Sequence, residues 1–403
     1  MLKTLFRLAA LLVLIALVSA AALTRLTGAV IKNAEGKRIG YSQATHEWLF
    51  LEYPGVRPCR DGPYVFRDGK RRTALRLDRR HAEDAVEAIT AEVGKKVEVQ
   101  VDDAQGTRFS VPLRDEYPRQ PTTWPMPRRM LVLSDIEGQF EALRALLQHS
   151  GVIDRRMHWR FGDGRLVLVG DLVDRGNNVV PVLWLLYRLE AEAQAAGGGL
   201  HYVLGNHEQM MMLGRADYVA PKYLATFRLG GQNQQALWSG RSELGLWLRS
   251  KPVLLKIGDV LFVHGGVSAD VLAAGVDLDA VDALAARYLA TDPRGGDAIA
   301  QRVLSGRTGL LWYRGLAMPT DDYPKDDAAH VQRVLEAFGV GHIAIGHTMV
   351  QHVGEDVGGK VLRVDVDHAA GVSEALWFED GAIQSVDAQG RRRPLRPARN
   401  LED

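Results

Sequence analysis

Cysteine and net charge are what this sequence of 403 residues has least of. Cys59 is its single cysteine, so the chain cannot form an internal disulfide and lacks the cysteine spacing of a zinc ribbon. Any bound metal must therefore be held by oxygen and imidazole ligands. With 50 basic and 49 acidic residues, the net charge is only +1, which provides no global field to attract nucleic acid or an anionic membrane. We expect no nucleic-acid partner.

The N-terminus contains an uncharged, mostly aliphatic run from residue 8 to residue 24. Lys3 and Arg7 precede this run, and small residues close it before Arg25. The pattern is typical of a secretory signal peptide, and the run is also near the shortest length that spans a bilayer. Residues 1–27 are therefore predicted to be a signal peptide or an uncleaved membrane anchor. In both cases we expect an exported protein, periplasmic or held in the inner membrane by this segment.

The rest of the chain divides into four predicted parts. Residues 28–114 have the turns and alternation of a small, mainly β accessory domain, interrupted by one helical stretch near residues 81–93. Four prolines within residues 115–129 indicate an extended linker without regular structure. Residues 130–388 are predicted to be the catalytic domain, and the arginine-rich residues 389–403 a solvated basic tail.

In the predicted catalytic domain, strand-like apolar runs alternate with helical stretches at Phe140–His149 and Val179–Ala195. This alternation indicates an α/β fold with parallel strands, in which ligands gather at the carboxyl ends of the strands. Later apolar runs, separated by turns such as Gly258-Asp259, indicate a second, mixed sheet.

Five short polar clusters follow apolar runs and contain the residue types that hold divalent metals. They are Ser134-Asp135-Ile136-Glu137-Gly138, Gly170-Asp171-Leu172-Val173-Asp174-Arg175-Gly176, Gly205-Asn206-His207-Glu208, His264-Gly265-Gly266 and Gly346-His347-Thr348. Each has a simpler interpretation as a turn, a helix cap or a packed turn residue. Because all five occur in one chain, we favour a two-metal hydrolytic site.

The predicted metal ligands divide between two ions. If the first strand extends far enough, Asp135 and Glu137 project from one face and hold the first ion. Asp171 ends the next strand, and its two oxygens allow it to bridge both ions. The second ion then takes an amide oxygen and two imidazoles, from Asn206, His264 and His347.

Four further residues are candidates for catalysis and substrate binding. His207, charged and oriented by the carboxylate of Asp174, is the predicted general acid for the leaving oxygen. Arg175 has the planar guanidinium that suits two phosphoryl oxygens, and Arg314 is a second candidate for that role. Together with Asn206, these arginines form the predicted substrate-binding set.

The clusters resemble those of the calcineurin-like metallophosphoesterase family. GDxxDRG with GNHE and HGG is similar to the phosphoprotein phosphatase branch, which includes the bacterial Shewanella-like phosphatases, over about residues 129–384. The resemblance implies a four-layer α/β/β/α sandwich of two mixed sheets. It also implies metal ligation by Asp135, Asp171, Asn206, His264 and His347, with His207, Asp174, Arg175 and Arg314 in the roles given above.

Glu137 departs from the family pattern, which usually has histidine at this position. A carboxylate still ligates metal but adds negative charge. The affinity of the site for harder ions such as Mn²⁺ or Mg²⁺ therefore rises relative to its affinity for Zn²⁺ or Fe. We therefore expect two divalent ions, with Mn²⁺ favoured.

The predicted activity is hydrolysis of phosphomonoesters, on phosphoprotein-like or small substrates, by a hydroxide that bridges the two metals. Two alternatives remain open at this point. The same site could cleave a phosphoanhydride such as a dinucleoside polyphosphate, or the chain could be an inert binding module in which Glu137 marks a decayed site.

Overall fold

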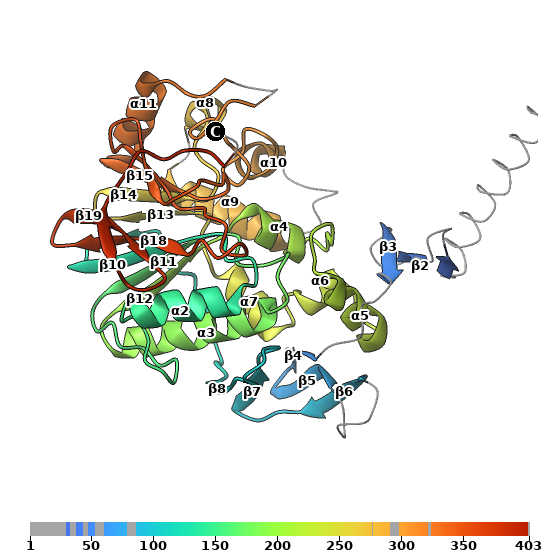
Figure 1. Ribbon diagram of the computed structural model, residues 1–403. Coiled ribbons are helices and arrows are strands. Elements are labelled where there is room, and N and C mark those ends of the chain that lie inside the picture. Colours follow the sequence, from blue (N-terminus) through green and yellow to red (C-terminus); the bar gives the residue numbers. More distant parts are fainter. Residues whose placement is uncertain are drawn as a thin grey trace, which may run out of the picture.

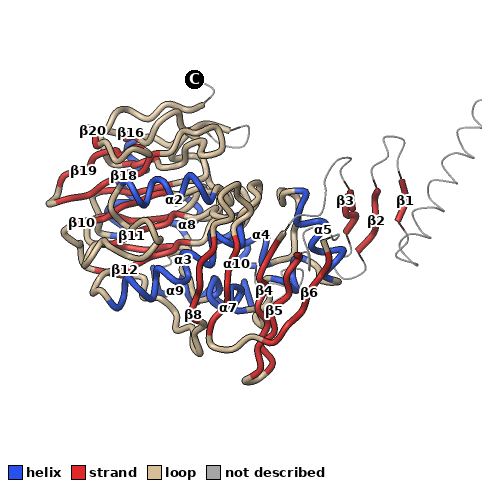
Figure 2. The backbone as a smooth tube through the Cα atoms, turned by 60° about the horizontal axis from the view of Figure 1, so that its bottom comes forward, coloured by secondary structure: helices blue, strands red, loops and turns tan. Residues whose placement is uncertain are grey.

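A computed structural model of the chain describes residues 60–78, 86–275, 277–290, 298–320 and 324–401, together with the backbone of three short strands nearer the N-terminus (Figures 1 and 2). Residues 1–27, predicted to be a signal peptide or anchor, lie outside the described residues. Among the helices that the structure describes, none combines the length and apolar character that crossing a membrane requires.

The first sheet of the catalytic domain is mixed. In spatial order its strands are β12 (Gly199–Val203), β11 (Arg165–Val169), β10 (Arg129–Leu133), β18 (Glu374–Glu379), β19 (Ala382–Asp387) and β20 (Arg392–Pro394). The first three run parallel to one another, and the last three continue the sheet in antiparallel pairs. Helices α2 (Phe140–His149) and α3 (Val179–Ala195) connect the parallel strands, as the apolar periodicity predicted.

The second sheet is also mixed and has six strands. In spatial order they are β16 (Gly354–Asp356), β17 (Val361–Arg363), β15 (His342–Ile345), β14 (Val260–Val263), β13 (Leu254–Ile257) and β9 (Thr123–Trp124). β14, β15 and β17 are parallel neighbours, whereas β13 pairs with β14 in the antiparallel sense.

The two sheets pack face to face, and alternate side chains of each strand point toward or away from the interface between them. Met130 and Val132 belong to the same apolar cluster as Phe262 of the second sheet, so this face of β10 lies between the sheets. Leu131 and Leu133 instead belong to the cluster that includes the buried faces of α2 and α3. Helices α9 (Leu278–Ala290) and α11 (Ala328–Phe338) flank the second sheet (Figure 1). The predicted four-layer sandwich is confirmed.

Shorter helices complete the catalytic domain and carry or frame its loops. They are α4 (Asn206–Met212), α5 (Pro221–Gly230), α6 (Gln234–Leu237), α7 (Glu243–Arg249), α8 (Ala269–Ala273) and α10 (Ala298–Leu304). Of these, α4 begins directly after β12, at the carboxyl edge of the first sheet.

The region before the catalytic domain is β-rich, as predicted. Its strands are β1 (Val30–Lys32), β2 (Arg38–Ser42), β3 (Glu47–Glu52), β4 (Asp61–Asp68), β5 (Arg71–Asp78), β6 (Glu87–Glu92), β7 (Lys96–Gln100) and β8 (Arg108–Pro112). The helix predicted near residues 81–93 is wrong, because residues 87–92 form β6. Their backbone groups pair with β5, and this pairing outweighs the helix propensity of the alanines and glutamates in the segment.

Two segments predicted to lack regular structure take part in the sheets. Within the proline-rich segment, Thr123–Trp124 pairs with β13 and forms the edge of the second sheet. The predicted basic tail is exposed over residues 391–394, but it is not free: β20 pairs with β19, and Asn400 forms a bridge with Val350. Arg363, fully buried, donates a hydrogen bond to Asn400 Oδ1 at 2.7 Å. The chain end is therefore held against both sheets.

Candidate metal centre and active site

The five polar clusters occupy the loops that follow β10, β11, β12, β14 and β15, where carboxyl ends of strands meet. The prediction that Asp135 and Glu137 share a strand face required the first strand to extend to them. The strand ends at Leu133, so this condition is not met. Both residues instead have left-handed backbone conformations, with φ of 51° and 46°. Asp171 and His347 also have positive φ, at 54° and 62°. Such strained conformations cluster at functional sites.

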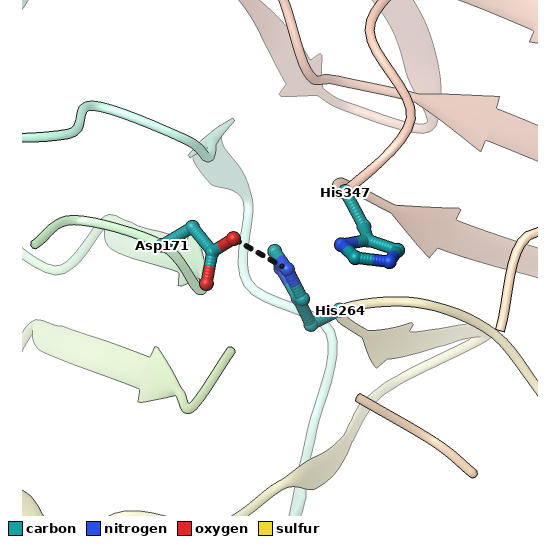
Figure 3. Close-up of side chains that lie close together, drawn as sticks. All are labelled: Asp171, His264 and His347. Carbon is teal, nitrogen blue, oxygen red and sulfur yellow. Dashed lines mark ion pairs between the residues drawn. The ribbon is translucent and has the colours of Figure 1, made fainter. Parts of the chain in front are cut away.

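Three predicted metal ligands come together in the centre of this region. Single ligand atoms of Asp171, His264 and His347 all lie within 4.8 Å of one another, and all three residues are buried (Figure 3). Asp171 Oδ2 lies 2.9 Å from His264 Nε2. Because the three residues are far apart in sequence, only the packing of the two sheets brings them to one point.

Backbone carbonyl groups orient the two imidazoles. His264 Nδ1 donates to the carbonyl oxygen of Val169 at 2.7 Å, which leaves Nε2 facing Asp171 and the side-chain oxygen of Asn206, 2.9 Å away. His347 Nε2 donates to the carbonyl oxygen of Trp312 at 3.1 Å, which leaves its Nδ1 available. Fixing one nitrogen of a histidine in this way is typical of metal ligands.

Asp135 joins this group from the loop after β10. Its Oδ2 accepts hydrogen bonds from the backbone N–H of His347, at 3.2 Å, and from the hydroxyl of Ser134. Burial raises the pKa of Asp135 to about 6; His264 opposes this shift, whereas the neighbouring charge of Asp171 adds to it. Asp135 therefore lies against the same centre as the other ligands.

The electrostatics of the group favour a cation. Burial alone would raise the pKa of Asp171, but His264 and His207 outweigh it and hold this pKa well below its usual range. Burial lowers the pKa of His264, but Asp171 and Asp135 raise it to about 10. Burial and the nearby His264 hold the pKa of His347 far below its usual range. Buried carboxylates, an amide oxygen and two imidazoles fit divalent ions as ligands.

Glu137 lies beside Arg175, which was predicted to bind phosphate. Its carboxylate forms an ion pair with the guanidinium of Arg175, and the side chains of Glu137 and Arg175 are 13% and 46% exposed. The two loops touch so closely that a Cβ on Gly176 would lie 2.2 Å from the carbonyl oxygen of Glu137. Ligation of metal by Glu137 stays a prediction.

His207 and Asp174, predicted to act as an acid pair, are in contact. His207 Nδ1 lies 2.8 Å from Asp174 Oδ2, and His207 Nε2 faces the centre, 3.7 Å from Asp171 Oδ2. Burial lowers the pKa of His207, but Asp171 and Asp174 outweigh it and raise this pKa above its ordinary value. His207 is thus protonated over a wider pH range than a free histidine.

Arg314 contacts the last of the five polar clusters. It donates hydrogen bonds to the carbonyl oxygen of His347 and, at 3.2 Å, to the hydroxyl of Thr348. It also lines an open cleft of about 480 Å³ with Trp312, His347 and two further arginines. The structure therefore places Arg314 at the rim of the centre.

Two buried carboxylates of the site were not predicted. Glu208 accepts hydrogen bonds from the backbone N–H groups of Asp171, Leu172 and Gly205 and thereby joins the second and third clusters. Its place within GNHE was the available signal. Asp365, which follows β17, is buried, and burial and Asp135 hold its pKa well above the usual range. The signal there was an acidic residue inside an apolar run.

Comparisons with known proteins agree with this geometry. Residues 128–351 match the family model described as calcineurin-like phosphoesterase. Shewanella-like protein phosphatase 2 of Arabidopsis thaliana is 26% identical over 306 residues, which are 63% of this chain and 75% of that protein.

A solved structure of a cold-active protein tyrosine phosphatase from a psychrophilic Shewanella species is similar over 84% of this chain and the whole of that one. The TM-score is 0.74 and the sequence identity 30%. A symmetrical bis(5'-nucleosyl)-tetraphosphatase of Neisseria meningitidis is 31% identical over 135 residues, which are 34% of this chain and 42% of that protein.

Proposed function

Because the chain belongs to the calcineurin-like phosphoesterase family and is a phosphoesterase, we propose that it hydrolyses phosphomonoesters of phosphoproteins with two divalent ions. The observation that carries this proposal is the convergence of Asp171, His264 and His347 beside the His207–Asp174 pair. Tyrosine phosphate is the substrate that we favour, since the structurally similar Shewanella enzyme is a protein tyrosine phosphatase.

Six residues would hold the ions: Asp135, Glu137, Asp171, Asn206, His264 and His347. Bound ions supply Lewis-acid stabilisation of the phosphoryl oxygens and activation of water at neutral pH. Mn²⁺ or Mg²⁺ is the preferred metal in this proposal because carboxylates dominate the first ion's ligands.

The protein's own residues supply the remaining steps. Arg175 binds phosphoryl oxygens with its guanidinium, and Arg314 at the rim contributes a second positive charge. His207 gives the proton on Nε2 to the leaving oxygen, while Asp174 holds Nδ1 and stabilises the charged ring. His207 and Asp174 are buried, and the exclusion of bulk water strengthens the interaction between them.

A phosphoanhydride is the second candidate substrate. The match to a bis(5'-nucleosyl)-tetraphosphatase covers 135 residues and favours it specifically. The same arrangement of acid, guanidinium and metal ligands can cleave an anhydride, since the leaving phosphate replaces the leaving alcohol.

The experiment is a substrate panel with the metal-depleted protein reloaded with Mn²⁺, Mg²⁺ or Zn²⁺. The panel contains a phosphotyrosine peptide, the matched phosphoserine peptide, p-nitrophenyl phosphate and a dinucleoside tetraphosphate. We expect the phosphopeptides and p-nitrophenyl phosphate to be hydrolysed, and chelation to abolish turnover. Preference for the tetraphosphate would favour the second candidate, and no turnover of any substrate with two ions bound would contradict both.

The variant His207→Asn tests the proposed proton transfer separately from metal binding. We expect kcat to fall by about a hundredfold while metal content is unchanged, because general acids contribute about that much. Loss of metal in this variant would contradict the proposal that His207 acts as the acid and is not a metal ligand.

We also propose export to the periplasm, which rests on residues 1–27 alone. Fusion of this segment to an enzyme that is active only when exported tests it. An inactive fusion would contradict the proposal.

A further inference from the structure

The loop between α4 and α5 carries an exposed aromatic side chain over the active site. Tyr218 is 47% exposed, and its ring centroid lies 5.0 Å from that of His207 at an interplanar angle of 66°. The guanidinium carbon of Arg175 lies 5.4 Å from the centroid of the same ring. Tyr218 thus touches both the proposed acid and the proposed phosphate-binding arginine.

The backbone holds this tyrosine in place independently of its side chain. The carbonyl oxygen of Tyr218 accepts a hydrogen bond from the backbone N–H of Arg175 at 2.9 Å. Removing the ring therefore leaves the link between the two loops intact, so the role of the ring can be tested separately.

The position of the acid defines where the leaving group emerges. His207 Nε2 must reach the leaving oxygen, and Arg175 must reach the phosphoryl oxygens of the same substrate. A side chain that contacts both residues and remains exposed lies beside the group attached to that leaving oxygen. Within the described residues, Tyr218 is the exposed aromatic side chain that meets this condition.

We propose that Tyr218 is a specificity-determining residue whose ring packs against an aromatic leaving group and so favours aryl over alkyl phosphoesters. This inference rests on the proposed function and adds the residue responsible for selectivity. Aromatic rings attract each other in offset or edge-to-face arrangements, whereas the short alkyl group of phosphoserine offers little surface to the ring.

A different role would be purely supportive. If the ring only steadied His207, its removal would slow all substrates equally, and binding of unreactive ligands would not change. The two roles therefore differ in the ratio between aryl and alkyl ligands.

The test uses the full-length protein loaded with Mn²⁺ and the variants Tyr218→Ala and Tyr218→Phe. Met126→Ala is the matched control, because it removes another exposed large side chain, at 43% exposure, next to the amino end of β10. Inhibition by phenylphosphonate and by methylphosphonate reports binding without any leaving-group chemistry. The phosphotyrosine and phosphoserine peptides then report kcat and KM.

We expect Tyr218→Ala to weaken phenylphosphonate about three- to tenfold and methylphosphonate hardly at all, as loss of one aromatic contact predicts. The preference for the phosphotyrosine peptide should fall by a similar factor, mainly through KM, with metal content unchanged. Tyr218→Phe and Met126→Ala should keep the wild-type ratios.

Equal losses for both phosphonates, unchanged binding of both, or a uniform fall in kcat for both peptides would overturn this assignment and leave the proposed function intact. Failure of the wild-type protein to hydrolyse either peptide would instead count against the proposed function. Metal content and far-ultraviolet circular dichroism identify a variant that has merely misfolded, and Tyr218→Leu then replaces Tyr218→Ala.

Discussion

Arg175 and Glu137 form an ion pair, so the guanidinium proposed to bind phosphate is held by the carboxylate that stands where the family usually has histidine. A substrate phosphate must compete with this carboxylate for Arg175. The ion pair therefore links the unusual residue of the first cluster to substrate affinity.

With excess Mn²⁺ keeping the metal sites filled, Glu137→Gln should tighten the binding of inorganic phosphate by about two- to fivefold, because a partly exposed ion pair contributes up to about 1 kcal/mol. Competitive inhibition of p-nitrophenyl phosphate hydrolysis measures this affinity. Glu379→Gln is the matched control, since it removes the glutamate of another partly exposed ion pair, with Arg392. Unchanged affinity would mean that Glu137 does not restrain Arg175, and metal analysis of the same variant tests its ligation.

Asp171→Asn should lose at least one metal ion per chain and more than about a hundredfold in kcat, because the proposed bridging carboxylate would be gone. Metal analysis after loading with excess Mn²⁺ and steady-state kinetics measure both effects. Asp174→Asn serves as the control for loss of a buried carboxylate nearby and should retain its metal. Full turnover by Asp171→Asn would contradict the proposed centre.

Asp174→Asn should move the basic limb of the pH–rate profile to lower pH. A general acid works only when protonated, so activity falls as pH rises through its pKa. Asp174 is one of the groups that raise the pKa of His207, and its neutralisation lowers that pKa. Asp217→Asn, an exposed nearby acid, should leave the limb in place, and an unmoved limb in Asp174→Asn would argue against the acid pair.

Because His201 is held neutral in the folded protein, the free energy of unfolding should decrease as pH falls below about 6.5. Burial, with the charge of Arg165, lowers the pKa of His201 to about 3, and its Nδ1 lies 2.9 Å from Gln120 Nε2. Between pH 6.5 and 3, His201 is protonated in the unfolded chain but neutral in the folded chain. The free energy of unfolding therefore decreases as pH falls.

Urea unfolding at pH 7 and pH 5 measures this effect. From pH 7 to pH 5, the wild-type protein should lose about 1 to 2 kcal/mol more than His201→Gln, which cannot take up that proton. Equal losses in both proteins would show that His201 does not control the acid limb of stability.

Local periodicity was sufficient to predict the elements with strong patterns. The helices at Phe140–His149 and Val179–Ala195 match the predicted stretches. The first has buried apolar residues at helical spacing, whereas the second is apolar along nearly all of residues 179–189 and is too long for a strand. The segment at residues 87–92 was predicted as helix and forms a strand, because pairing with β5 lies outside what a local window contains. The two-residue strand at Thr123–Trp124 escaped prediction for the same reason.

The sequence by itself determined which side chains are available and in which order: the carboxylates, the amide and the histidines at the ends of apolar runs. Only the tertiary structure decided their distances, because residues such as Asp171 and His347 are brought together by contacts between two stacked sheets. The same packing paired Glu137 with Arg175 and placed Tyr218 over His207. Chemical identity is a local property of the chain, whereas proximity depends on long-range packing that no short motif encodes.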